Sequence, residues 1–213
     1  FQKFKDILTP LQDGESYFLC ASARNKYLSS TERELLGFNA DKMFNQTLVT
    51  DLGNLEYSVN KCLTSFSLPS KRNLVIPRTA CVVYFCINPR SLLKGFIQFQ
   101  TKILESFALQ SLTPNPQYTY LNKIVNNLYS AIQRSKSRGI WIDIDIDVDK
   151  QKSDIAYLLV LCLKKNNVEN YTIETKSGYH ILIKRSSLKG SSFKLQEELE
   201  KAWKEYTGTN NYK

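Results

Sequence analysis

Residues 140–148, with the sequence IWIDIDIDV, constrain the fold more than any other segment of the chain. Apolar and acidic residues alternate there, and a period of two is that of a β-strand. Such a strand directs its acidic side chains to one face and its isoleucines to the other. The acidic row comprises Asp143, Asp145, Asp147 and Asp149. Because aspartate is disfavoured in strands, this row indicates a functional rather than a purely structural role.

Adjacent aspartates in the row are separated by roughly 7 Å along the strand. Carboxylates at that spacing repel each other, and a divalent cation between two of them relieves the repulsion while leaving positions for water and phosphate oxygens. A solvent-facing edge strand that discourages aggregation is the structural alternative, although lysine and glutamate are its usual residues. An EF-hand calcium loop fits poorly because Val148 occupies the position that needs glycine.

His180 is the only histidine in the chain, and it follows Ser177 and Gly178 at the point where one strand turns into the next. A serine hydroxyl, backbone N–H groups made accessible by glycine, and an imidazole at the start of a strand are the parts of a phosphate-binding site. A ring satisfied by a neighbouring backbone group is the alternative for an isolated histidine. The acidic strand, one strand–helix–strand unit upstream, favours the phosphate-binding interpretation.

Hydrophobic periodicity elsewhere predicts a mixed α+β or α/β fold with two lobes, residues 1–138 and 139–213, that meet near Arg138. The apolar run 80–87 is expected to be a central strand that ends at Asn88-Pro89. Further strands are expected at 16–23, 62–68, 171–175 and 180–184. Helices are expected at 31–44, 91–109, 118–136, 153–165 and 193–206.

The net charge of +9 favours a polyanionic partner, with nucleic acid first. Four basic residues near expected strand ends could contact template phosphates: Arg24, Lys26, Arg78 and Arg90. Tyr27 and Tyr84 lie close to them in the sequence and could stack on bases. A scatter of solvated surface charges is the alternative for any single member of this set.

The chain shows neither an apolar run long enough for a membrane helix nor a signal peptide, which predicts a cytoplasmic protein, inside the host cell if viral, and not a secreted one. Its five cysteines lack the CxxC spacing of a zinc site and are expected to be reduced thiols. The start at Phe1 rather than methionine predicts a fragment of a longer protein.

Together, the two motifs resemble those of the archaeo-eukaryotic primase superfamily, the primase-polymerases of archaea, eukaryotes, viruses and plasmids. The first family motif is a strand of the form hhhDhD, matched by residues 140–145 (IWIDID). The second is a small residue, any residue and histidine, matched by Gly178-Tyr179-His180 with Ser177 before it. Residues 84–90 (YFCINPR) are also similar to a segment in the amino-terminal half of viral and phage members.

This resemblance implies a two-lobed primase-like fold whose second lobe carries the acidic strand in a sheet like that of an RNA-recognition motif. Asp143 and Asp145 would coordinate catalytic Mg2+ or Mn2+. His180, with Ser177, Gly178 and Lys184, would contact the triphosphate of the incoming nucleotide. The implied activity is that of a DNA primase or primase-polymerase, which makes primers from nucleoside triphosphates on a single-stranded DNA template, beside a replicative helicase.

The chain departs from the family pattern at the third motif, an aspartate on a later strand. No aspartate follows His180. Either the third carboxylate lies beyond Lys213, or the chain is a catalytically inactive module that binds single-stranded nucleic acid. A metal-dependent nuclease is a further alternative, and it lacks a general-base lysine or histidine beside the acids.

Overall fold

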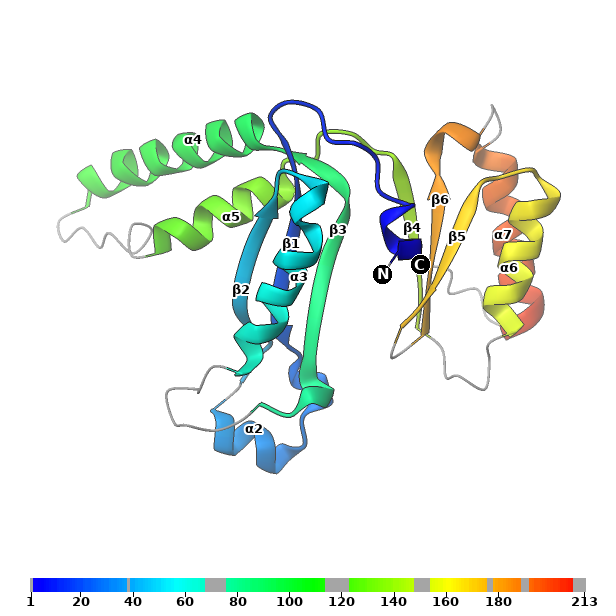
Figure 1. Cartoon of the computed structure of the whole chain (residues 1–213), viewed down its shortest axis with the longest axis horizontal. Helices are drawn as coiled ribbons and strands as arrows, with labels where there is room; N and C mark the ends of the chain where they lie inside the picture. The colour runs from blue at the N-terminus through cyan, green and yellow to red at the C-terminus, as the bar shows by residue number, and fades with distance from the viewer. Residues whose placement is uncertain are drawn as a thin grey trace. The chain divides into compact units, whose positions relative to one another are not determined.

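The computed structural model describes residues 2–37, 39–67, 76–113, 123–147, 154–175, 178–188 and 192–208. The chain divides into two compact units: Leu8–Arg138, and Gly139–Lys213 together with Phe1–Ile7. Each unit contains one antiparallel three-stranded sheet with helices, so the fold is mixed α+β (Figure 1). We call them the Leu8–Arg138 unit and the acidic-strand unit.

In the Leu8–Arg138 unit, the sheet has the order β2-β1-β3. The central strand β1 (Glu15–Ala23) pairs with β2 (Lys42–Val49) on one side and β3 (Cys81–Ser91) on the other. Every residue of β1 is buried, since neighbouring strands flank it and α3 (Leu55–Thr64) packs against the sheet. On the face that carries Phe18, the ring of Tyr129 from α5 makes an edge contact at 6.3 Å.

Two helices of this unit, α4 (Leu92–Ser111) and α5 (Ile124–Arg134), lie side by side (Figure 1). They approach each other closely at Gly95, where a Cβ atom would lie 2.8 Å from the Ile132 Cα atom. The shorter helix α2 (Ser30–Leu36) begins with a capping box between Ser29 and Glu32. Short 3-10 helices complete the unit: η1 (Asn25–Tyr27), η2 (Leu52–Asn54), η3 (Ser65–Ser67) and η4 (Arg78–Ala80).

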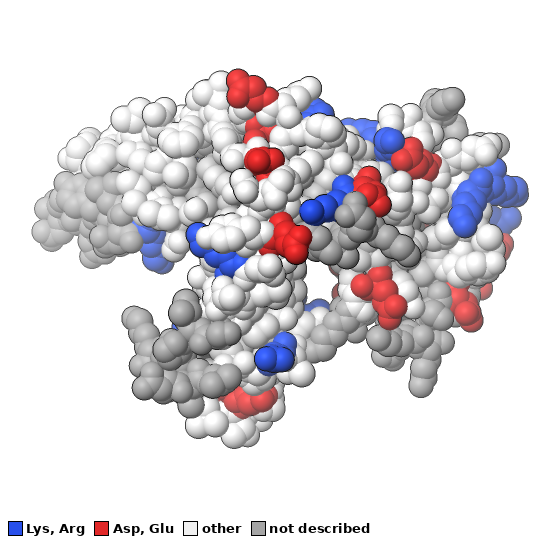
Figure 2. Space-filling model, viewed as in Figure 1, with Lys and Arg blue, Asp and Glu red and all other residues white. Residues whose placement is uncertain are grey.

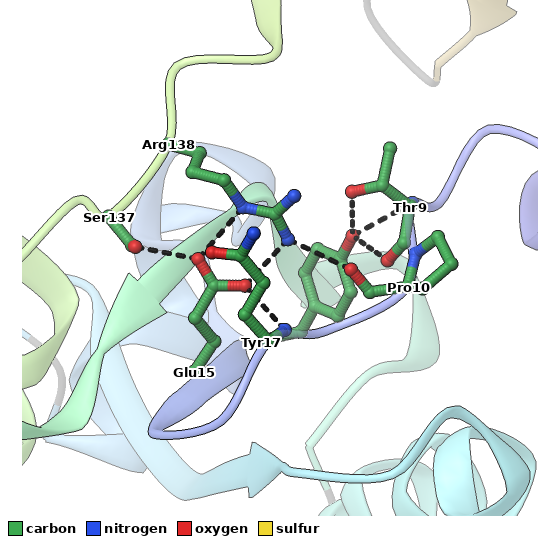
Figure 3. A network of polar contacts seen from close by, with 7 residues as sticks. Thr9, Pro10, Glu15, Tyr17, Ser137 and Arg138 are labelled. Atoms are coloured by element: carbon green, nitrogen blue, oxygen red, sulfur yellow. Dashed lines mark hydrogen bonds and ion pairs between the residues drawn. The ribbon is translucent and has the colours of Figure 1, made fainter.

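A polar network fixes the start of β1 (Figure 3). The Glu15 carboxylate, 5% exposed, accepts hydrogen bonds from Arg138 Nε at 2.9 Å and Arg138 Nη2 at 2.6 Å. It also accepts from the Ser137 hydroxyl at 2.6 Å and the Gln12 backbone N–H at 2.8 Å. Burial alone would raise the Glu15 pKa, but these donors outweigh it and lower the pKa to about 2.

Three sequence predictions in this unit are wrong. The helix expected over 31–44 ends at Leu36, because Gly37 adopts the left-handed conformation of a helix cap with φ 65°, and β2 follows. The strand expected at 62–68 is, over its described residues 62–67, the end of α3 followed by η3. The strand expected to be central, β3, lies at an edge of the sheet and continues through Pro89, which an edge strand tolerates.

In the acidic-strand unit, the sheet has the order β4-β6-β5. The strands are β4 (Trp141–Asp147), β5 (Asn170–Glu174) and β6 (Gly178–Lys184). The helices are α1 (Gln2–Lys5), α6 (Asp154–Lys165), α7 (Ser192–Thr207) and the 3-10 helix η7 (Arg185–Ser187). The expected strands at 140–148, 171–175 and 180–184 and the helices at 153–165 and 193–206 are confirmed within one or two residues over their described parts.

One face of this sheet is closed by α6 and α7, which lie on the same side of it (Figure 1). Ile146, Ile181 and Ile183 pack there against Leu159 of α6 and Leu199 of α7. The alternation of β4 therefore has the predicted result, with isoleucines in the core and aspartates on the other face.

Among the described residues, no helix combines the length and the apolar character needed to cross a membrane. All five cysteines are free thiols.

Candidate functional site

The face of the acidic-strand sheet that α6 and α7 leave uncovered brings together the residues that the sequence singles out. In the antiparallel pairing of β4 with β6, Asp145 lies directly opposite His180, and Asp143 lies opposite Leu182. Directly opposite residues in antiparallel strands share a face. Asp143, Asp145 and His180 are therefore neighbours, although 37 residues separate the first from the last.

The His180 imidazole lies between the two aspartates. Its Nδ1 atom is 3.0 Å from Asp143 Oδ1 and 3.1 Å from Asp143 Oδ2, and its Nε2 atom is 3.7 Å from Asp145 Oδ1. The side chains of His180, Asp143 and Asp145 are 33%, 45% and 62% exposed. All three are accessible to a ligand approaching the open face.

The carboxylates favour a protonated imidazole. The hydrogen bond to Asp143 raises the His180 pKa, partial burial opposes this, and the negative charges of Asp143, Asp145 and Asp147 raise the pKa further. A protonated ring carries N–H donors on both nitrogens. With Nδ1–H donated to Asp143, Nε2–H is the donor that can serve an anionic ligand.

The carboxylates of this face are oxygen ligands of the kind that Mg2+ and Mn2+ prefer. Within the described ranges, no group of three His, Cys, Asp or Glu side chains comes together as a metal site. Asp143 and Asp145 alone supply two carboxylates, and Mg2+ is commonly held by one or two carboxylates together with waters and substrate phosphates. Two exposed carboxylates therefore fit a cation that arrives with a nucleotide better than one bound permanently.

The other residues predicted to contact phosphate are Ser177, Gly178 and Lys184, and the described ones lie at opposite ends of β6. Gly178 opens β6 opposite Asp147 and is buried. Lys184, at the other end of β6, is held by Glu169, whose carboxylate oxygens lie 2.9 and 3.0 Å from Lys184 Nζ. Ser177 lies outside the described residues. Lys184 is thus paired with a glutamate that directly precedes β5, whereas His180 is in contact with the aspartates.

Sequence reasoning missed the aromatic side chain on this face. Tyr171 of β5 lies opposite Leu182, on the same face as Asp143, and is 39% exposed. Its ring makes an edge contact with Trp141 at 5.5 Å between centroids, and Trp141 donates from Nε1 to the Ile7 carbonyl. The alternation of the segment YTIE could have placed Tyr171 on that face, but not beside Asp143, because strand pairing fixes that relation.

Three of the four basic residues proposed to contact a template gather at one end of the other sheet. Arg24 follows β1, Lys26 lies in η1 and Arg78 begins η4, and the Arg24 backbone N–H donates to the Ala80 carbonyl at 2.9 Å. Arg24 also donates to the Tyr84 hydroxyl and lies 2.7 Å from Asp41 Oδ2. Its charge is therefore partly compensated.

Lys26 and Arg90 complete the set. Lys26 Nζ lies 5.2 Å from the centre of the Tyr27 ring, a cation–π contact. Arg90 lies opposite Ser16, whereas Cys81 at the start of β3 lies opposite Ala23, so Arg90 is at the far end of the strand, roughly 30 Å from Cys81, which directly follows η4 and its Arg78. The four residues do not form one patch. On the face shown in Figure 2, the described basic side chains alternate with acidic ones and form no broad positive band.

In comparisons with known proteins, the chain matches no protein-family model, no curated protein and no solved structure.

Proposed function

We propose that the chain is the catalytic core of a DNA primase or primase-polymerase, a nucleotidyl-transferase that makes primers on single-stranded DNA. One observation carries the proposal: Asp143, Asp145 and His180 lie together on the open face of a sheet whose other face is packed against helices. A pair of carboxylates beside an imidazole offers ligands for a divalent cation and an N–H donor for the phosphate that the cation accompanies.

Each residue then has a definite task. Asp143 and Asp145 would hold Mg2+ or Mn2+, which when bound lowers the pKa of an attacking 3′-hydroxyl and stabilises the charge on the leaving pyrophosphate. His180 donates from Nε2 to a phosphate oxygen of the nucleoside triphosphate. Asp143 also orients the ring through its contact with Nδ1. Asp147, exposed on the same face, adds negative charge to the site.

The template would run over the Arg24, Lys26 and Arg78 end of the other sheet, where Tyr27 and Tyr84 offer rings for base stacking. Phosphate contacts from that end would make binding depend on salt. A replicative helicase is the expected partner of a primase. We propose no contact surface for it.

The experiment is incorporation of labelled nucleotide on single-stranded DNA with Mn2+, comparing the unaltered protein with an Asp143→Ala, Asp145→Ala double variant. Asp13→Ala, an exposed acid in the Leu8–Arg138 unit, is the matched control. We expect incorporation by the unaltered protein and the control and none by the double variant. Incorporation that survives in the double variant would remove the acidic strand from the chemistry.

His180 can be tested separately. His180→Ala is expected to raise KM for the nucleotide more than it lowers kcat, because the imidazole binds phosphate rather than the reacting hydroxyl. His180→Lys, which keeps a positive charge, should recover part of the lost affinity. Equal KM values in all three proteins would contradict a phosphate-binding role.

A second candidate function is a single-strand-binding module without catalysis. The observation that favours it is the lack, within the described part of the chain, of a third carboxylate brought to the face from another strand. The glutamates of α7 cannot supply it, because α7 packs against the opposite face through Leu195 and Leu199. Salt-dependent binding of single-stranded DNA, with no incorporation by the unaltered protein, would select this function over the first.

A further inference from the structure

Helix α4 exposes a stripe of large apolar side chains along its length. Of its twenty residues, only Gly95 and Phe99 are buried. Five large apolar side chains along the helix remain 43–70% exposed: Leu93, Phe96, Ile97, Leu104 and Phe107. The surface over α4 also shows no charged side chain in the view of Figure 2, at its upper left. Contiguous apolar surface of this kind is uncommon on monomers and marks an interaction site.

The spacing of the stripe is that of a helix–helix seam. Positions 93, 97, 100, 104 and 107 follow one another at intervals of four, three, four and three residues, the heptad pattern of paired helices. Four of the five are apolar, and the middle one is Gln100. A single polar residue in an apolar seam sets the register of pairing. We call Leu93, Phe96, Ile97, Gln100, Leu104 and Phe107 the α4 stripe.

We propose that the α4 stripe binds the α4 stripe of a second copy of this chain, in an antiparallel pair centred on Gln100. A two-fold axis at Gln100 places the two amides opposite each other, and an amide can both donate to and accept from its equivalent. The same axis brings Leu93 opposite Phe107 of the second copy, and it places Ile97 next to Leu104 of the second copy, one residue from the directly opposite position. Every large apolar side chain of the seam then meets another one.

Charge decides between antiparallel and parallel pairing. Lys94 and Glu105 are eleven residues apart, so they lie on the same side of the helix within about 20°. Antiparallel pairing about Gln100 brings Lys94 of each copy beside Glu105 of the other, whereas parallel pairing sets like charges against each other. In the described part of the chain, neither side chain makes an ion pair. Glu105 also lines a groove of about 550 Å3 beside the stripe, between α4 and α5.

The area available fits a weak dimer. At their observed exposures, the five apolar side chains offer on the order of 500 Å2 a copy, since one large side chain buries about 150–250 Å2. A stable complex buries roughly 800 Å2 on each partner, so the stripe with its polar flanks supplies the lower end of that range. We therefore expect a reversible dimer whose population rises with protein concentration.

Sedimentation velocity over a wide range of concentration tests the proposal on the full chain. Ile97→Glu and Leu104→Glu should each weaken dimerisation at least about tenfold, because each places a charge in an apolar seam. Leu109→Glu is the matched control: Leu109 is 68% exposed on the same helix but lies outside the stripe, and its variant should dimerise normally. Circular dichroism of each variant verifies that the chain still folds.

Charge reversal tests the orientation. Lys94→Glu and Glu105→Lys should each weaken the dimer about two- to tenfold, and the double variant should recover the original affinity. A chain that stays monomeric at every concentration would overturn the proposal and assign the stripe to a different partner. A dimer that Ile97→Glu leaves intact would place the interface elsewhere. If the double variant dimerises more weakly than either single variant, the antiparallel register is excluded.

Discussion

Strands β1 and β4 show two ways of building a three-stranded sheet. In β1, all nine residues are buried, so both faces of the strand are enclosed. In β4, by contrast, Asp143, Asp145 and Asp147 are exposed while Ile146 is buried. Substitutions in β1 therefore disturb packing, whereas the aspartates of β4 are open to solvent and can meet a ligand.

The acidic residues of the two strands differ in burial and in their partners. Glu15 on β1 is 5% exposed and is held by Arg138, Ser137 and a backbone N–H. Asp143 on β4 has a side chain 45% exposed and contacts His180. A buried, fully bonded carboxylate contributes to stability, whereas an exposed carboxylate beside an imidazole is available to a ligand. Substitutions in the two strands should therefore change different measurable quantities.

The largest expected effect is on activity and comes from the open face. Asp143→Asn should lower nucleotide incorporation at least about 100-fold, since stabilisation of transition-state charge by a bound cation is worth several kcal/mol. The free energy of unfolding should change by less than about 1 kcal/mol, because an exposed ion pair contributes little. Steady-state kinetics and urea unfolding measure the two quantities. A large loss of stability in Asp143→Asn would contradict the expectation that substitutions on the exposed face of β4 leave stability almost unchanged.

The next effect is on stability and comes from the enclosed sheet. Leu19→Ala at the centre of β1 should lower the free energy of unfolding by about 2–5 kcal/mol, through lost burial and the cavity left behind. Leu112→Ala, at a leucine that is 82% exposed, is the control and should change it by less than about 0.5 kcal/mol. Urea unfolding of the two variants, monitored by far-UV circular dichroism, measures both changes. Equal small effects would contradict the enclosed character of β1.

The sequence predicts the acidic-strand unit well because its signals are local. Alternation in β4 fixes both the strand and its exposed face, and helical periodicity fixes α6 and α7. These local signals do not predict the pairing of Asp145 with His180, since no local pattern states which residues of two strands lie opposite each other.

The Leu8–Arg138 unit is harder to predict because tertiary contacts override local preference. The segment around Cys62 is apolar enough for a strand, yet it forms the end of α3, which packs against β1. The run before Pro89 looks like a central strand by composition, but β1 takes that position and β3 an edge. The exposed α4 stripe is likewise invisible in sequence, because the same periodicity describes a helix that packs into a core.

The buried carboxylate of Glu15 should make the stability of the fold depend on pH in the acid range. The Glu15 pKa is lowered to about 2 in the folded chain from 4.5, so its bonds contribute about 3 kcal/mol above pH 4.5, and this contribution is lost as the pH falls toward 2. Glu15→Gln should therefore lower stability by a similar amount at neutral pH and flatten the acid dependence over that window. The exposed Asp13→Asn variant is the control. Urea unfolding at a series of pH values gives the comparison, and an unchanged acid slope in Glu15→Gln would remove Glu15 as its source.

The smallest effect tests how far close packing extends beyond the first sheet into α4 and α5. At Gly95, an added methyl group would lie 2.7 Å from Ile132 Cγ1 and 2.8 Å from Ile132 Cα, so the helices must separate. Overpacking of this kind costs about 1–3 kcal/mol, and the helical preference of alanine over glycine returns about 1 kcal/mol. We expect Gly95→Ala to lower the free energy of unfolding by about 1 kcal/mol. Urea unfolding measures this, with Asn126→Ala at an exposed position of α5 as the control. A more stable Gly95→Ala variant would mean that the two helices separate without loss, and that tight packing in this unit is confined to the sheet.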